Sequence, residues 1–348
     1  MDENKKKVTK FIRNFLFFII LIILTFYFVF KDANVIEIIY VLGNVKKEYV
    51  LLALILMGVY ITCDALNIGR GLKTLKEKSS FLKNIKYSLI GFFFSGITPA
   101  ASGGQPMQIY YMKKDGITVA NSTLVFLINL TCVQIVTISL ALFSVCINYR
   151  YLSVPMMWFF ALGILLNAFA LSALVISITS RKLTKWIINK TVVIMRFFKI
   201  KNLDEKEENL IKELKTYQVG ARYMKLNIPL VLKTLGCTYI QFICFYAIAY
   251  FVYRAFGLND FNIFELTTLQ AVLYGTTSAI PSPGAVGVSE GGYMAIYASI
   301  YTESVLSSAM LLTRGINFYL FMIISAVVVL VNDIRSRRDV TTVNNQIE

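Results

Sequence analysis

Apolar residues along the chain fall into long runs that are separated by short polar or basic segments. Most of the long runs approach or exceed the roughly 20 apolar residues that a helix needs to cross a bilayer. The pattern therefore predicts an all-α integral membrane protein with about six full transmembrane helices. The expected helices lie at about 15–30, 49–69, 117–148, 155–180, 228–253 and 304–331.

Two further apolar segments, 87–112 and 264–301, contain Pro and Gly near their centres. The arm Tyr87–Thr98 would span only roughly 18 Å as a helix, whereas the hydrocarbon core is roughly 30 Å thick. The chain is basic on both sides of the first segment, so we expect it to enter and leave by the same face. Both segments are therefore predicted to be re-entrant helical hairpins, whose irregular backbone must be buried in protein or line a water-filled cavity.

The two hairpins are expected to enter the membrane from opposite faces. The half at about 49–148 and the half at about 228–331 would then form an inverted-topology repeat, with the two breaks meeting near the midplane. The alternative is that the Pro and Gly residues are unrelated kinks in ordinary spanning helices.

Each hairpin also contains signals for a helix that restarts within the membrane. Ser102 and Gln105 fit a capping box, and Pro106 falls in the first turn; Ser282 and Pro283 suit a cap and a first position in the second hairpin. Helix N-termini carry free N–H groups that suit an anion such as a phosphate. A stripe of small residues that allows close helix packing follows the second break: Gly287, Gly291, Ala295 and Ser299.

Charge placement orients this model in the membrane. The net charge is +15, and most of the 35 Lys and Arg residues fall in segments on one side, which predicts that both termini are cytoplasmic. The expected organisation is a basic N-terminus at 1–14, a membrane domain at 15–331, a cytoplasmic amphipathic connector at 181–226 and a cytoplasmic tail at 332–348. This placement also argues against direct nucleic-acid binding.

The composition excludes several kinds of chemistry. The chain has no histidine, which rules out a His base and a histidine-ligated metal. Its five cysteines lie inside apolar runs without CxxC spacing, so we expect no metal site, no cofactor and no catalytic residue.

Asp64, Glu290 and Arg314 lie within apolar regions, where an ionised group is costly and marks a functional site by default. We expect Arg314 and the two helix N-termini to hold a phosphate, while Glu290 or Asp64 meets a cationic headgroup or holds Arg314. The alternative is a purely structural ion pair of Arg314 with Glu290 or Asp64. The full predicted lipid-binding set, including groups at a cytoplasmic mouth, is Asp64, Arg70, Pro99, Ser102, Gly103, Gly104, Gln105, Lys113, Ser282, Pro283, Gly284, Glu290 and Arg314.

The stretches TPAASGGQP (98–106), YYMKKDG (110–116) and IPSPGAVGVSEGG (280–292), with the later Arg314, carry a family resemblance. Here the chain resembles the membrane domain of the lysylphosphatidylglycerol synthase/flippase family of bacterial membrane proteins. In two-domain members, a soluble domain transfers lysine from lysyl-tRNA to phosphatidylglycerol, and the membrane domain passes the cationic lipid to the outer leaflet. We expect a stand-alone form without the transferase domain.

The resemblance implies a flippase that binds and translocates phosphatidylglycerol or an aminoacylated derivative in the bacterial cell membrane. Such a protein changes surface charge and the resistance to cationic antimicrobial peptides. One alternative is phosphatidylglycerol lysyltransferase activity in lipid metabolism, which would need a separate transferase as partner. A second is an inverted-repeat transporter of a small solute or ion. Homo-oligomerisation stays open.

Overall fold

The computed structural model describes residues 42–98, 101–179, 222, 226–278 and 280–344, and throughout these ranges the protein consists of helices joined by short turns. The all-α prediction is confirmed. The principal elements, in chain order, are α3 (Lys47–Thr74), α4 (Phe81–Gly96), α5 (Gly104–Lys114), α6 (Val119–Asn148), η2 (Tyr149–Tyr151), α7 (Val154–Thr179), α10 (Ile228–Ala255), α11 (Ile263–Thr277), η3 (Pro283–Ala285), α12 (Val288–Tyr297), α13 (Glu303–Arg314), η4 (Gly315–Tyr319) and α14 (Leu320–Asn344).

Five stretches of helix in the described region are long and apolar enough to cross a membrane. They are α3, α6, most of α7, α10 and the continuous stretch Val305–Asp333 formed by α13, η4 and α14. These elements match five of the six predicted spanning helices. The sixth, at 15–30, lies outside the described residues, as do the N-terminal segment 1–14 and nearly all of the connector 181–226.

The ends of two long helices differ from the prediction. Helix α3 continues to Thr74, so Arg70 and Lys73 lie in its last turns and not in a loop. Cations are favourable there because the C-terminal end of a helix carries partial negative charge. The last long helix contains the π-helical turn η4, and α14 continues to Asn344 through most of the expected tail.

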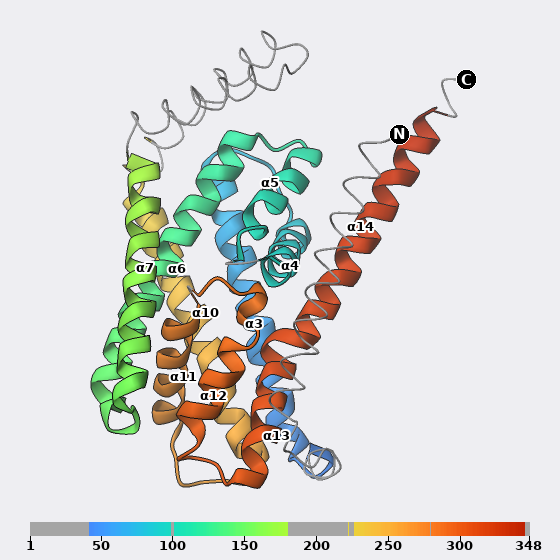
Figure 1. Ribbon diagram of the computed structural model, residues 1–348. Coiled ribbons are helices and arrows are strands. Elements are labelled where there is room, and N and C mark those ends of the chain that lie inside the picture. The colour runs from blue at the N-terminus through green and yellow to red at the C-terminus, as the bar shows by residue number, and fades with distance from the viewer. Residues whose placement is uncertain (1–41, 99–100, 180–221, 223–225, 279, 345–348) are drawn as a thin grey trace, which may run out of the picture.

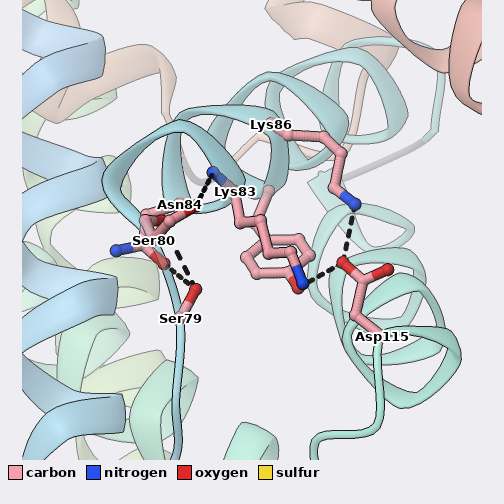
Figure 2. A network of polar contacts seen from close by, with 7 residues as sticks. Ser79, Ser80, Lys83, Asn84, Lys86 and Asp115 are labelled. Atoms are coloured by element: carbon pink, nitrogen blue, oxygen red, sulfur yellow. Dashed lines mark hydrogen bonds and ion pairs between the residues drawn. The ribbon is translucent and has the colours of Figure 1, made fainter.

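Helices α4 and α5, here called the first pair, are too short to cross a membrane separately. Helix α4 has 16 residues and starts at Ser80, whose hydroxyl accepts a hydrogen bond from the Lys83 N–H at 3.3 Å. The adjacent Ser79 hydroxyl donates to Asn84 Oδ1 at 2.6 Å, which holds the entry of the chain into the helix (Figure 2). Residues 97–103, here called the first break, separate α4 from the 11-residue α5.

Helices α11 and α12 form a second pair of the same kind. Helix α11 has 15 residues and begins with a complete capping box between Asn262 and Glu265. Residues 278–287, the second break, contain the short 3₁₀ turn η3, and α12 has only 10 residues. The residues of the small stripe on α12, including Gly291, are exposed, so this stripe does not pack within the described chain.

The two pairs occupy different halves of the molecule, beside the long helices (Figure 1). The first pair lies in the upper half of the view and the second pair in the lower half. Most buried apolar residues of the first pair, such as Ile90, belong to one apolar cluster, and most of those of the second pair, such as Leu269, belong to another. The membrane placement of the pairs and the inverted repeat stay predictions.

The second break approaches the end of α4, where Gly284 meets Gly96. A Cβ atom added to Gly284 would lie 3.1 Å from the Gly96 carbonyl oxygen and 2.2 Å from Phe318 Cζ. Gly284 also has a φ of +59°, a conformation that side chains disfavour. A glycine is therefore required where the second break meets the end of α4.

Candidate functional site

A cavity of about 650 Å³ lies between the two pairs and the long helices, and both breaks contribute to its wall. Six of the predicted site residues line it: Asp64, Ser102, Gln105, Ser282, Gly284 and Arg314. Its volume falls within the range of small-molecule sites. The wall also carries many side-chain amides, which is unusual inside a bundle of apolar helices.

Arg314 reaches the cavity from the last turn of α13 and is almost fully buried. Its Nε donates to Glu290 Oε1 at 2.7 Å, and its Nη2 donates to the Gly284 carbonyl oxygen at 3.0 Å. The guanidinium carbon lies 4.3 Å from the centre of the Phe318 ring, within range of a cation–π interaction. The arginine thus fastens α13 to the second break and to α12.

Glu290 lies in the first turn of α12, forms an ion pair with Arg314 and does not itself line the cavity. Besides the ion pair, its Oε1 accepts from the Tyr319 hydroxyl at 3.1 Å, and its Oε2 accepts from the Gly287 N–H at 2.8 Å. Because these contacts occupy both oxygens, Glu290 acts as a positioning residue. Of the two acids considered as partners for Arg314, the structure pairs Glu290 with it.

Asp64 lies on α3 and lines the cavity without an ion-pair partner among the described residues. The Ser88 hydroxyl interacts with its carboxyl group, although it forms no well-aligned hydrogen bond. Since Glu290 neutralises Arg314, the cavity has an excess of one negative charge when Asp64 is ionised. An unpaired acid at this position is costly and is typical of a functional site.

The first break is closed differently from the predicted capping box. Gly103 is the N-cap of α5, and no side-chain cap is formed. Instead, the Thr98 hydroxyl accepts from the Gly103 N–H at 2.8 Å and donates to the Phe94 carbonyl oxygen at 2.6 Å. Ser102 is exposed to the cavity, so the prediction that it caps α5 is wrong. The N-cap lies one residue later than predicted, at Gly103, whose backbone is helical. Ser102 therefore does not occupy the N-cap position, from which a side chain accepts from the first N–H groups of a helix.

Gly104 does not line the cavity but allows α5 to pack closely against α4. A Cβ atom at this position would lie 2.1 Å from Ser95 Oγ and 3.0 Å from the Gly91 carbonyl oxygen. The predicted Pro99 lies outside the described residues. The first break therefore depends on glycine packing and on one threonine.

After the second break, the next α-helix starts later along the chain than predicted. Ser282 and Pro283 begin only the 3₁₀ turn η3, and α12 starts at Val288. Three residues with positive φ intervene, which prevents a continuous right-handed helix: Gly284, Ala285 and Gly287. Ser282 lines the cavity, but its hydroxyl does not cap η3.

Arg70 and Lys113 do not line the cavity. Arg70 Nη1 donates to Asn67 Oδ1 at 2.6 Å and to the Lys233 carbonyl oxygen at 3.2 Å, so it connects α3 with α10. Lys113 lies exposed in the last turn of α5. The structure therefore does not bring these two residues to a mouth of the cavity.

The outer ends of the first pair are joined by Asp115, as Figure 2 shows. Lys86 Nζ lies 2.6 Å from Asp115 Oδ2, and the Tyr87 hydroxyl donates to the same oxygen. Partial burial alone would raise the pKa of this carboxyl group, but the bonds from Lys86 and Tyr87 and the charge of Lys83 hold its pKa below the usual value.

Sequence reasoning missed the neutral residues of the cavity wall. Asn129 and Gln134 on α6, Gln241 on α10, Gln270 on α11 and Asn317 in η4 all line it. A usable signal was present, because amide side chains in the middle of apolar membrane helices usually face other protein or a polar cavity.

Comparison with known proteins adds an independent finding. The family model described as "Lysylphosphatidylglycerol synthase TM region" matches residues 15–325, which includes every cavity element described above. A search of curated proteins finds no significant match. The family match covers most of the 348 residues. The chain thus belongs to the family of the lysylphosphatidylglycerol synthase transmembrane region.

Proposed function

We propose that the protein binds a phospholipid and moves it between the leaflets of the bacterial cell membrane. In this proposal the headgroup occupies the cavity while the acyl chains stay in the surrounding lipid. The substrate is phosphatidylglycerol or an aminoacylated derivative, and its movement changes surface charge and the resistance to cationic antimicrobial peptides. Both termini are in the cytoplasm, and the two helix pairs are re-entrant hairpins of an inverted repeat.

The observation that carries this proposal is a cavity with polar side chains in its wall, bordered by two broken helices among helices that are long and apolar enough to cross a membrane. Lipid cannot satisfy exposed backbone N–H and C=O groups, so breaks at membrane depth must face protein or a polar cavity. Transporters place their substrates at such breaks. Membership of a family named for lysylphosphatidylglycerol supports a lipid as the substrate.

The charged residues suit different parts of a headgroup. Nε and Nη2 of Arg314 make the two hydrogen bonds described above, and a guanidinium has five N–H donors, so donors remain for a phosphate oxygen. Glu290 keeps the guanidinium in place. Asp64 offers acceptors to groups of the headgroup that carry N–H or O–H bonds.

The test is lipid movement in reconstituted vesicles. Phosphatidylglycerol with a fluorescent acyl chain should become accessible to an outside quencher faster with the protein than in empty vesicles. Asp64→Asn should slow this movement by about tenfold or more, because hydrogen bonds to charged groups contribute about 1.5–3 kcal/mol. Glu303→Gln, the same change at an exposed position outside the cavity, should leave the rate unchanged. Equal rates in protein-containing and empty vesicles would refute the proposal.

A small-cation transporter is the second candidate, and the unpaired Asp64 favours it. A single carboxylate in a polar cavity can bind a metal cation or a proton as well as a headgroup. Uptake of a radioactive or fluorescent solute, driven by a Na⁺ or H⁺ gradient, would support this candidate if no lipid moves in the same vesicles.

A further inference from the structure

Asn167 on α7 connects three parts of the molecule through one buried side chain. It lines the cavity and is only 2% exposed. Its Nδ2 donates to the Gly163 carbonyl oxygen at 2.9 Å, one turn earlier on α7, and to the Gly275 carbonyl oxygen on α11 at 3.2 Å. The Ser278 hydroxyl lies 3.3 Å from Nδ2 and 3.5 Å from Oδ1. Asn167 therefore joins α7 to the end of α11 and to the first residue of the second break.

These contacts fall where α11 needs partners from outside. The last four carbonyl groups of a helix have no partner within that helix. At the end of α11, the Tyr274 carbonyl oxygen accepts from the Ser278 N–H at 2.9 Å, and Asn167 provides a donor for Gly275. Because a buried carbonyl oxygen requires a hydrogen bond, Asn167 acts as a C-terminal cap that comes from a different helix.

The backbones of α7 and α11 touch one turn before Asn167, at Gly163. A Cβ atom added to Gly163 would lie 2.6 Å from the Thr276 carbonyl oxygen and 2.7 Å from the Gly275 carbonyl oxygen. The two helices are thus in contact along the turn that carries the asparagine. Close packing of this kind leaves little room for α7 to shift against the end of α11.

The next two turns of α7 form part of the cavity wall, through Ala170, Ala173 and Leu174. Helix α7 is also the least buried of the five helical stretches that could span a membrane, and it stands at the edge of the bundle in Figure 1. One helix therefore carries a side of the cavity and contacts the second break. The shape of the cavity and the position of that break depend on each other.

The second break is held at two places by two different helices. Arg314 at the end of α13 donates to the Gly284 carbonyl oxygen, and Asn167 on α7 contacts Ser278. Ser282 lies between these two places, lines the cavity and has a buried Oγ. Release of either contact would free one side of the segment that contains Ser282.

We propose that Asn167 is a positioning residue that anchors the start of the second break to α7. Through this contact it keeps the second break in place as a wall of the cavity, and it acts on a bound lipid through the break. The proposal concerns the cavity of the proposed function and rests on that function only for its effect on lipid movement.

Thiol labelling of the full chain in detergent tests the anchor. The Oγ atoms of Ser282 and of Ser88 on α4 are both buried in the cavity wall, so Ser282→Cys is the reporter and Ser88→Cys is its matched control. Asn167→Leu should raise the labelling rate at position 282 by about tenfold, because a buried thiol reacts through local opening. The rate at position 88 should stay unchanged. Mass spectrometry of peptides separates these labels from those on the five native cysteines.

Two results of the labelling experiment would overturn the anchor. One is an unchanged rate at position 282, and the other is an equal rise at both positions, which would indicate general loosening of the fold. If Asn167→Leu does not fold, Ser278→Ala removes one contact and should raise the rate at position 282 by about threefold; no rise would overturn the anchor. Added to Asn167→Leu, Ser278→Ala should have little further effect, since both variants break the same contact.

Lipid movement provides the second measurement. In vesicles with fluorescent phosphatidylglycerol, Asn167→Leu should slow movement by about tenfold, whereas Leu165→Ala, at an exposed position of α7 outside the cavity, should not. An unchanged rate for Asn167→Leu beside an active wild type would overturn the positioning role. If the wild type moves no lipid, the proposed function fails, and the labelling comparison decides the anchor alone.

Discussion

The two helix pairs look alike in outline, but their breaks are held by different forces. The first break has no charged residue in its described part and is closed by Thr98 and by the close approach of Gly104 to α4. The second break is held by Arg314 from α13, which binds Glu290 on α12 and the Gly284 carbonyl oxygen.

This difference has a consequence for folding and for function. The hydrogen bonds of Thr98 and the close approach of Gly104 to α4 join residues within 91–104, so these contacts can form locally. The second break depends on a side chain 24 residues from its acidic partner. A charged ligand at Arg314 would therefore act directly on the geometry of the second break, whereas the first break would respond only through packing.

The largest expected effect follows from breaking the buried ion pair. Arg314→Met or Glu290→Gln alone should lower the free energy of unfolding by about 3–5 kcal/mol, because each leaves a buried polar or charged group uncompensated. The double variant should be much less destabilised than the sum of the two single variants. Thermal unfolding in detergent, followed by tryptophan and tyrosine fluorescence, measures all three. Additive losses would show that the two residues do not act as a pair.

A glycine comparison tests the close packing of the first pair. Gly104→Ala should destabilise the protein by about 1–3 kcal/mol, because the new methyl group would meet Ser95 Oγ and the Gly91 carbonyl oxygen. Gly291→Ala on α12 is the matched control: no atom lies within 4 Å of its added Cβ. It should be neutral or stabilise by up to about 1 kcal/mol through helix propensity.

Each result of the glycine comparison has a separate meaning. A neutral Gly104→Ala would contradict the close contact of α4 with α5. A destabilising Gly291→Ala would indicate that the exposed small-residue stripe packs against a second copy of the chain, which cross-linking at increasing protein concentration would reveal.

The smallest expected effect concerns the exposed ion pair between Lys86 and Asp115, at the outer ends of α4 and α5. Because the folded-state pKa of Asp115 is lowered, its contribution is present above its unfolded pKa of about 3.9 and is lost as the pH falls through the folded value. The wild type should lose more stability than Asp115→Asn between pH 5 and pH 3, by less than about 1 kcal/mol.

Salt provides the control for this pH effect. Because exposed charges are screened, 1 M NaCl should reduce the difference between the wild type and Asp115→Asn. A pH dependence that is equal in both proteins would show that Asp115 makes no contribution through ionisation.

The order of the helices and the positions of the two breaks follow from the sequence. Apolar length and the Pro and Gly residues near 99–104 and 281–284 are local properties, and they predicted five spanning helices that the structure contains. The three ionisable residues in apolar regions were also recognisable, because charge inside a membrane segment is rare. Two of them, Asp64 and Arg314, line the cavity.

Only the tertiary structure determined which groups act together. Both Asp64 and Glu290 were possible partners for Arg314, and the packing of α12 against α13 brings Glu290 to it and leaves Asp64 facing the cavity. The caps differ from prediction because α5 begins after Gly103, whose N–H donates to Thr98, and because three residues with positive φ delay the start of α12. The uncharged polar residues of the cavity wall likewise come from positions far apart in the chain. Which of them meet depends on how the helices pack, and no local sequence pattern records that packing.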